Sequence, residues 1–236
     1  MAAATITARS RRVRTSAGPR WRRAGLVATA LGGLAFFASS CLGSGYAYIS
    51  HTNPDGTDVY FKVPSQWTLF DTNQIIVAEN GPLGPSQKKQ IANSEWLMSM
   101  TSDPRATAKD TLSLGNSYPS GIVEARLLPE NQRDVLSFST MRSEILGTDP
   151  LTATSGYQVL TYDEFTYPGG VRGVKFTVNI TSKNKPTRTW GQVTAVDPQT
   201  NWIMSIGIGC KAECWGANSG AIKQILDSWT VKEQNP

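Results

Sequence analysis

The chain has 236 residues, a formal net charge of +5 and a pI near 9.2. Seven of its 23 Lys and Arg residues lie within residues 1–23. The part after Cys41 therefore has 16 basic residues and all 18 acidic ones, which gives it a net charge of about −2. This balance argues against a nucleic-acid-binding domain, and seven Trp among 39% hydrophobic residues argue against a disordered chain.

The N-terminal region has the features of an export signal. Residues 24–38 (AGLVATALGGLAFFA) are uncharged and follow the arginine-rich run. A membrane-spanning helix needs about 20 apolar residues, so residues 1–40 predict a lipoprotein-type signal peptide. Small residues precede Cys41, which resembles the bacterial lipoprotein box and predicts a lipid on this cysteine. An ordinary cleavage site, an uncleaved anchor helix and export by the twin-arginine route stay open as alternatives.

Residues 41–58 are rich in Gly, Ser, Asn and Tyr and predict a tether. Residues 59–236 then predict one globular domain. His51, the one histidine, falls within the expected tether, so we expect no catalytic role for it. Asp55 and Asp58 lie in the string DGTD, for which a turn is a better interpretation than a calcium loop.

The first half of the expected domain mixes strands, loops and one helix. Alternating apolar residues and turn residues predict strands at 59–63, 67–70, 96–101 and 121–128, and a loop at 80–94. Pro129 suits the first turn of a helix. Apolar residues recur at helical spacing up to Ile145, so this helix is expected to end near Gly147.

The second half predicts an antiparallel meander and a covering helix. The expected strands are 157–167, 172–180, 189–196 and 202–208, joined by turns. Asn218 is expected to cap a helix with an apolar stripe from Ile222 to Trp229, followed by an edge segment at 230–232. The predicted fold class is α+β, an antiparallel β-sheet flanked by helices.

Two segments resemble a known family. FKVPSQWTLF (61–70) resembles the start of PsbP-like domains, and IKQILDSWTVK (222–232) resembles their close. CKAECW (210–215) resembles the branch formed by actinobacterial lipoproteins. The resemblance implies an α/β/α sandwich that serves as a binding or accessory scaffold, and none of the family's site residues can be transferred to this chain.

Cys210 and Cys214 are an even pair in a chain expected to be exported, which predicts a disulfide. The closed loop is short, so the chain-entropy model gives this bond about 2 kcal/mol. A redox dithiol and a metal-binding pair are the alternatives, but redox motifs usually space their cysteines by two residues, and no further metal ligands are evident.

Trp190, Trp202 and Tyr162 are candidates for lining a groove that binds a sugar or an apolar ligand. Packing in the core is the competing interpretation, because aromatic side chains dominate protein cores.

Charged residues give weaker signals. Asp163 and Glu164 are neighbours on an expected strand, so they face opposite sides and cannot act together as an acid/base pair. Lys183, Lys185 and Arg188 form a basic hairpin tip, interpreted either as a contact for anionic lipid or wall polymer or as a soluble turn.

The sequence therefore predicts an extracytoplasmic lipoprotein held at the cell membrane by a lipid on Cys41. We expect it to act as a binding or accessory module of the cell envelope, with a protein, lipid or glycan partner. No catalytic residues, cofactor, metal or nucleic acid are expected. The alternatives are an envelope hydrolase that uses carboxylates and a structural envelope component.

Overall fold

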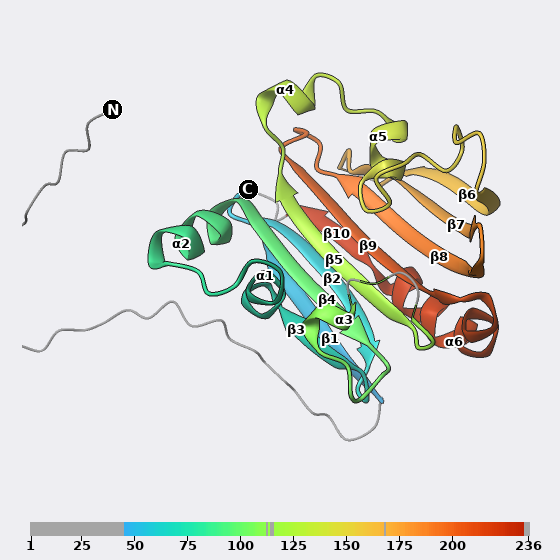
Figure 1. The fold of residues 1–236 in the computed structure, drawn as a ribbon. Helices are drawn as coiled ribbons and strands as arrows, with labels where there is room; N and C mark the ends of the chain where they lie inside the picture. Colours follow the sequence, from blue (N-terminus) through green and yellow to red (C-terminus); the bar gives the residue numbers. More distant parts are fainter. Residues whose placement is uncertain (1–44, 112, 114–115, 168, 234–236) are drawn as a thin grey trace, which may run out of the picture. The chain divides into compact units, whose positions relative to one another are not determined.

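The computed structural model describes residues 45–111, 113, 116–167 and 169–233. They form a seven-stranded sheet of order β3-β4-β5-β9-β8-β7-β6 and a three-stranded sheet of order β1-β2-β10 (Figure 1). All neighbouring strands are antiparallel, so the predicted α+β class is confirmed. The strands are β1 (Tyr46–Thr52), β2 (Thr57–Pro64), β3 (Thr68–Asp71), β4 (Glu95–Thr101), β5 (Ser120–Leu127), β6 (Tyr157–Thr166), β7 (Arg172–Ser182), β8 (Lys185–Val196), β9 (Trp202–Lys211) and β10 (Thr230–Glu233). The helices are α1 (Thr72–Asn80), α2 (Pro85–Ser94), α3 (Ala108–Thr111), α4 (Glu130–Arg133), α5 (Phe138–Ser143) and α6 (Ala212–Ser228).

Both faces of the seven-stranded sheet are covered. The small sheet and α6 pack on one face, where they share the largest hydrophobic cluster with β4, β5, β8 and β9. On the opposite face, α1 and α2 cover β4, and the segment carrying α5 covers β7 and β8. The structure therefore adds to the predicted sandwich a small sheet, which shares one outer layer with α6.

The two central strands, β8 and β9, are buried on both faces. Every residue from Trp202 to Cys210 is buried. The indole of Trp190 on β8 lies across Gly207 and Gly209 of β9, where an added Cβ atom would overlap its ring. Glycine is needed at both positions because the indole occupies the space that a side chain would fill.

Helix α6 carries the predicted apolar stripe, since Ile222, Ile225 and Leu226 are buried against the sheet. The predicted start was wrong: the helix begins at Ala212, directly after β9, and Asn218 lies inside it and donates to the Cys214 carbonyl. Among the described residues, no helix is long and apolar enough to cross a membrane.

The tether expected over residues 41–58 is wrong from residue 46 onward, because β1 pairs with β2 along its whole length. Ala47, Ile49 and His51 alternate with exposed polar residues, a strand pattern that the tether-like composition concealed. Residues 41–44 lie outside the described residues, as does the signal peptide expected over 1–40.

Two helices occupy what was expected to be a loop or was left unassigned. Asp71 accepts from the backbone N–H of Gln74, whose side chain accepts from Asp71 in return, a capping box that starts α1. Pro85 occupies the first turn of α2. The single helix expected after Pro129 is instead split into α4 and α5, because Ser137 caps a new start by accepting from the Thr140 N–H.

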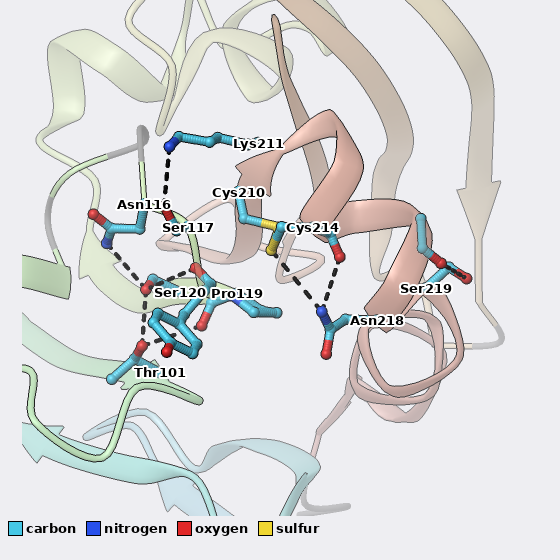
Figure 2. Close-up of a disulfide and its surroundings, with 12 residues drawn as sticks. Thr101, Asn116, Ser117, Pro119, Ser120, Cys210, Lys211, Cys214, Asn218 and Ser219 are labelled. Carbon is cyan, nitrogen blue, oxygen red and sulfur yellow. Dashed lines mark hydrogen bonds between the residues drawn. A yellow bond between two sulfur atoms is a disulfide. The ribbon is translucent and has the colours of Figure 1, made fainter. Parts of the chain in front are cut away.

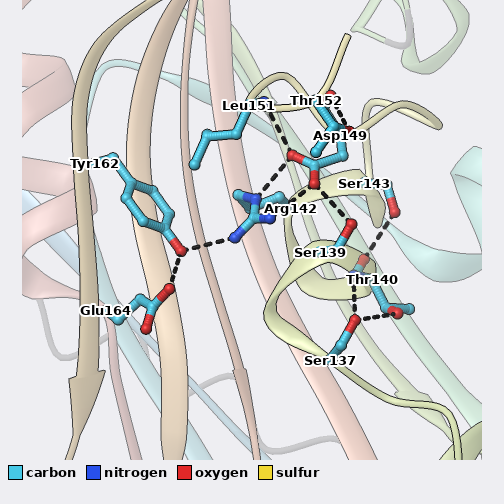
Figure 3. Close-up of polar contacts among 10 residues, drawn as sticks. All are labelled: Ser137, Ser139, Thr140, Arg142, Ser143, Asp149, Leu151, Thr152, Tyr162 and Glu164. Carbon is cyan, nitrogen blue, oxygen red and sulfur yellow. Dashed lines mark hydrogen bonds and ion pairs between the residues drawn. The ribbon is translucent and has the colours of Figure 1, made fainter.

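A buried ion pair orders the segment that carries α5, and the same arginine links this segment to β6 of the sheet (Figure 3). Arg142 donates from Nε and Nη2 to the two carboxylate oxygens of Asp149, at 2.8 and 2.7 Å. Its Nη1 donates to the Tyr162 hydroxyl on β6 at 2.7 Å, and that hydroxyl donates to Glu164. The bonds from Arg142, with smaller contributions from the Ser139 hydroxyl and the Leu151 N–H, lower the pKa of Asp149 to about 2. The buried Gln192 on β8 adds a second link by donating to the Met141 carbonyl at 3.1 Å.

Strand β6 is an edge of the seven-stranded sheet and most of its side chains are exposed. Its pairing with β7 shifts register between Val159 and Thr161, which marks a β-bulge. The opposite edge, β3, has only four residues.

We expect Asp149→Asn to lower the free energy of unfolding by about 3 kcal/mol, because it leaves the Arg142 charge buried without its partner. Urea denaturation of the two proteins measures this change. Asp163→Asn on β6 is the matched control, since Asp163 is exposed and its loss should change stability by no more than about 0.5 kcal/mol. Equal effects of the two substitutions would contradict the role given to Arg142.

Candidate functional site

A polar pocket of about 430 Å³ opens where the end of β4 and the start of β5 meet the loop between them. Its lining offers hydroxyl, amide and charged groups together with one aromatic ring and the methyl group of Ala106. The lining residues are Thr101, Asp103, Arg105, Ala106, Asp110, Asn116, Ser117, Tyr118 and Ser120. The pocket was not predicted, because residues 105–119 show no periodic pattern in the sequence.

The loop on one side of the pocket is shaped by two aspartates. Asp103 accepts from the backbone N–H of Arg105 at 3.0 Å. Asp110 accepts from both the N–H and the hydroxyl of Thr107, which lower its pKa. Both carboxylates thus hold local turns, while the Arg105 side chain is 82% exposed.

The floor of the pocket is a chain of hydroxyl groups (Figure 2). Ser120 donates to the Thr101 hydroxyl at 2.9 Å, and Thr101 donates to the Pro119 carbonyl at 3.2 Å. Asn116 donates from its side-chain amide to the Ser120 hydroxyl at 3.1 Å and to the Asp110 carbonyl at 2.8 Å. These bonds fix the orientation of the hydroxyl groups from which the pocket is built.

The disulfide lies beside this pocket (Figure 2). A disulfide joins Cys210 near the end of β9 to Cys214 in the first turn of α6, as predicted from an even pair of cysteines in a chain expected to be exported, and Lys211 lies between them. The Lys211 backbone N–H donates to the Asn116 carbonyl at 3.1 Å, and its Nζ donates to the Ser117 hydroxyl at 3.0 Å. The disulfide therefore restrains the residue that holds one wall of the pocket.

The groove expected from the aromatic residues does not form. Trp190 and Trp202 are 2% and 3% exposed and belong to different hydrophobic clusters. The two strands are central and covered on both faces, so their large side chains fill the core. Tyr162 takes part in the Arg142 network instead. Cys41 lies outside the described residues, so its lipidation stays a prediction.

The weaker candidates occupy surface turns and strands. Asp55 accepts from the Thr57 N–H in the turn between β1 and β2. Asp163 and Glu164 are adjacent on β6, where neighbouring side chains point to opposite faces. Lys183 and Lys185 are exposed at the β7–β8 turn, with Arg188 partly buried behind them.

A carboxylate pair was missed by the sequence analysis. Arg126 on β5 donates from Nη2 to Glu144 at 2.5 Å, and its Nε lies 3.4 Å from the Glu124 carboxylate. Burial, and then the charge of Glu144, raise the pKa of Glu124 to about 7. The signal was the pattern of β5, where Glu124 and Arg126 alternate with the buried Val123 and Ala125. Neither glutamate lines the pocket.

His51 is rigidly held, contrary to the tether expected around it. Its ring stacks on Trp96 with centroids 4.3 Å apart and an interplanar angle of 6°. Burial lowers its pKa to about 4, against the smaller opposing effects of Asn53 and Asp58. His51 is therefore neutral in the folded protein at neutral pH.

No protein-family model matches this sequence, and no curated protein matches it significantly. Solved structures similar to the chain include LpqN of Mycobacterium tuberculosis, which is described as involved in cell envelope biogenesis. LpqN is 16% identical to this chain, with a TM-score of 0.42, and the match covers 80% of this chain and 92% of LpqN. The Ran-binding protein Mog1p of Saccharomyces cerevisiae has 10% identity and a TM-score of 0.42, covering 80% of this chain and 97% of its own. PsbP of Synechocystis, from the group that the two sequence segments resemble, has 11% identity and a TM-score of 0.43, covering 84% of this chain and 99% of its own. Similarity at this level carries no information on function.

We expect His51 to contribute a loss of stability as the pH falls from about 6.5 to 4, because the unfolded chain then protonates His51 while the folded protein does not. Glu124 acts in the opposite direction, since its raised pKa makes the folded protein take up a proton between about pH 7 and 4.5. Urea denaturation across this range measures the sum of the two effects.

His51→Phe keeps a ring beside Trp96 and should remove the destabilising contribution, so the variant gains stability relative to the parent protein as the pH falls. Glu124→Gln should shift the curve in the opposite direction. Parallel pH curves for the parent protein and His51→Phe would contradict the burial of a neutral His51.

Proposed function

We propose that this chain is an extracytoplasmic lipoprotein, anchored through a lipid on Cys41, whose polar pocket binds a small polar ligand of the cell envelope. The observation that carries the proposal is the disulfide that holds Lys211 against the pocket wall. Disulfides persist mainly in oxidising compartments outside the cytosol, so the bond that shapes the pocket also supports export.

The chemistry of the pocket supports binding of a hydroxyl-rich ligand such as a glycan. Its volume falls within the range of small-molecule sites, about 300–1,000 Å³. The hydroxyl and amide side chains of the pocket can both donate and accept hydrogen bonds, as a sugar hydroxyl does. They belong to Thr101, Asn116, Ser117 and Ser120. Tyr118, 42% exposed at the rim, offers a ring face on which a sugar can stack.

The proposal is of a binding module without catalytic activity. The two carboxylates of the pocket, Asp103 and Asp110, are engaged in turns, which supports a structural role for them. The observation that favours the alternative, a hydrolase using carboxylates, is the Glu124–Glu144 pair with its raised pKa at Glu124. Arg126 bonds to Glu144 and lies beside Glu124, an arrangement that also suits a structural ion-pair network.

We expect maltose or diacetylchitobiose to shift the backbone amide NMR signals of Asn116, Ser117 and Lys211 in the purified full chain. Ser120→Ala should weaken binding about tenfold, because it removes a hydroxyl from the floor of the pocket. Thr161→Ala on the exposed edge strand β6 is the matched control and should bind as the parent does.

Replacing Cys210 and Cys214 by alanine should also weaken sugar binding, since the disulfide then no longer restrains Lys211. Unchanged amide signals at millimolar concentrations of both sugars would contradict a glycan ligand.

We expect Cys41→Ala to abolish incorporation of radiolabelled palmitate in a bacterial host that processes lipoproteins, and to move the protein from the membrane pellet to the soluble fraction. The physical reason is that the acyl chains, attached at this thiol, supply the membrane affinity. Cys210→Ala with Cys214→Ala is the control and should keep the label. A parent protein that carries no label would reject the anchor.

A further inference from the structure

The outer face of the three-stranded sheet carries tyrosines and lysines, while its inner face belongs to the core. Ile49, Phe61 and Val231 point inward and pack in the largest hydrophobic cluster. The alternating outward positions hold Tyr46, Tyr48, Tyr60, Lys62 and Lys232, which we call the Tyr–Lys face. Tyr48 is 69% exposed and Tyr60 is 39% exposed, so their rings are available to a second surface.

The register places the tyrosines and lysines side by side. Tyr48 lies opposite Lys62, and Ser50 lies opposite Tyr60. The Lys62 ammonium is 5.0 Å from the centre of the Tyr46 ring, and the Lys232 ammonium is 5.7 Å from that of Tyr60. Asp58 accepts hydrogen bonds from the Tyr60 and Thr52 hydroxyls, so its charge is engaged within the sheet.

This face begins five residues after the cysteine that the proposed function makes the lipid anchor. Five residues span at most about 17 Å when fully extended. A domain of this size has a radius of gyration of about 16 Å, and hence a width of roughly 40 Å. An anchored domain must therefore turn toward the bilayer a side that includes the start of β1, where Tyr46 and Tyr48 lie.

The chemistry of the face suits a bilayer surface. Tyrosine is enriched at membrane interfaces because its ring enters the headgroup region while its hydroxyl stays hydrated. Lysine near a membrane surface is attracted by anionic headgroups. We propose that the Tyr–Lys face is a second, non-covalent membrane contact, through which the three-stranded sheet lies against anionic lipid headgroups. This proposal rests on the proposed lipid anchor at Cys41.

Depth-dependent fluorescence quenching tests this contact on the full lipidated chain. The protein is reconstituted in two types of vesicle, one of pure phosphatidylcholine and one of phosphatidylcholine mixed with phosphatidylglycerol. Both contain a phosphatidylcholine spin-labelled near the headgroup. An environment-sensitive fluorophore is attached at Ser50→Cys, in the middle of the Tyr–Lys face. The matched control is Ser86→Cys on α2, which is exposed and belongs to the cover on the opposite face of the seven-stranded sheet. The native disulfide and the acylated Cys41 leave the new thiol as the one that reacts.

We expect the probe at residue 50 to be quenched at least about twofold more than the probe at residue 86. Tyr48→Ser with Tyr60→Ser should remove this difference in both vesicle types. Lys62→Gln with Lys232→Gln should reduce it in vesicles containing phosphatidylglycerol and leave it unchanged in pure phosphatidylcholine. Circular dichroism and urea denaturation check that these surface variants are folded.

The outcomes separate the two proposals. A parent protein that floats with the vesicles while both probes are quenched equally overturns the Tyr–Lys contact and leaves the anchor standing. A parent protein that does not float rejects the anchor, and the contact with it. Floating together with selective quenching at residue 50 supports both.

Discussion

Strands β8 and β9 have side chains packed on both of their faces, and most of the described chain supplies what covers them. A strand buried on both sides gives up the alternation of polar and apolar residues, and this is why Trp202 to Cys210 has no exposed position. Glycines at 207 and 209 of β9 leave room for the Trp190 indole, so the tightest packing occurs at the centre of the sheet. Gly191 plays the same part on the other face, where α6 approaches.

The two covers are fastened in different ways. Helix α6 is joined to the end of β9 by the disulfide, and the apolar stripe of the helix packs against the sheet in the largest hydrophobic cluster. The segment carrying α5 has little regular structure; it packs Met141 into a hydrophobic cluster with the sheet and adds two polar links to it. One runs from Arg142 to the Tyr162 hydroxyl, and the other from Gln192 to the Met141 carbonyl. Buried polar links of this kind are costly unless every partner is present, so the segment should be sensitive to single substitutions. The pocket lies beside this disulfide, which restrains Lys211 in its wall.

The sequence predicted the strands that follow a simple period well, because β7 alternates strictly and β9 is bounded by turn residues. It failed where tertiary packing or a local cap overrode composition. Gly, Ser and Asn around β1 suggested a tether, although Ala47, Ile49 and His51 already shared one face. Trp190 and Trp202 were candidates for a groove because a sequence does not show that both faces of their strands are covered. The pocket was beyond prediction, since its hydroxyl groups come from segments brought together only by the β4–β5 pairing and by Lys211.

The β-bulge in β6 has a consequence for how copies of this protein behave together. An edge strand of ten residues presents a row of backbone donors and acceptors that a strand from another molecule can extend. The irregular spacing between Val159 and Thr161 breaks that row in the middle, and the four-residue β3 at the opposite edge is too short to act as a template. Both edges of the seven-stranded sheet are therefore poor templates for a strand from another molecule, which is the way natural sheets discourage edge-to-edge association.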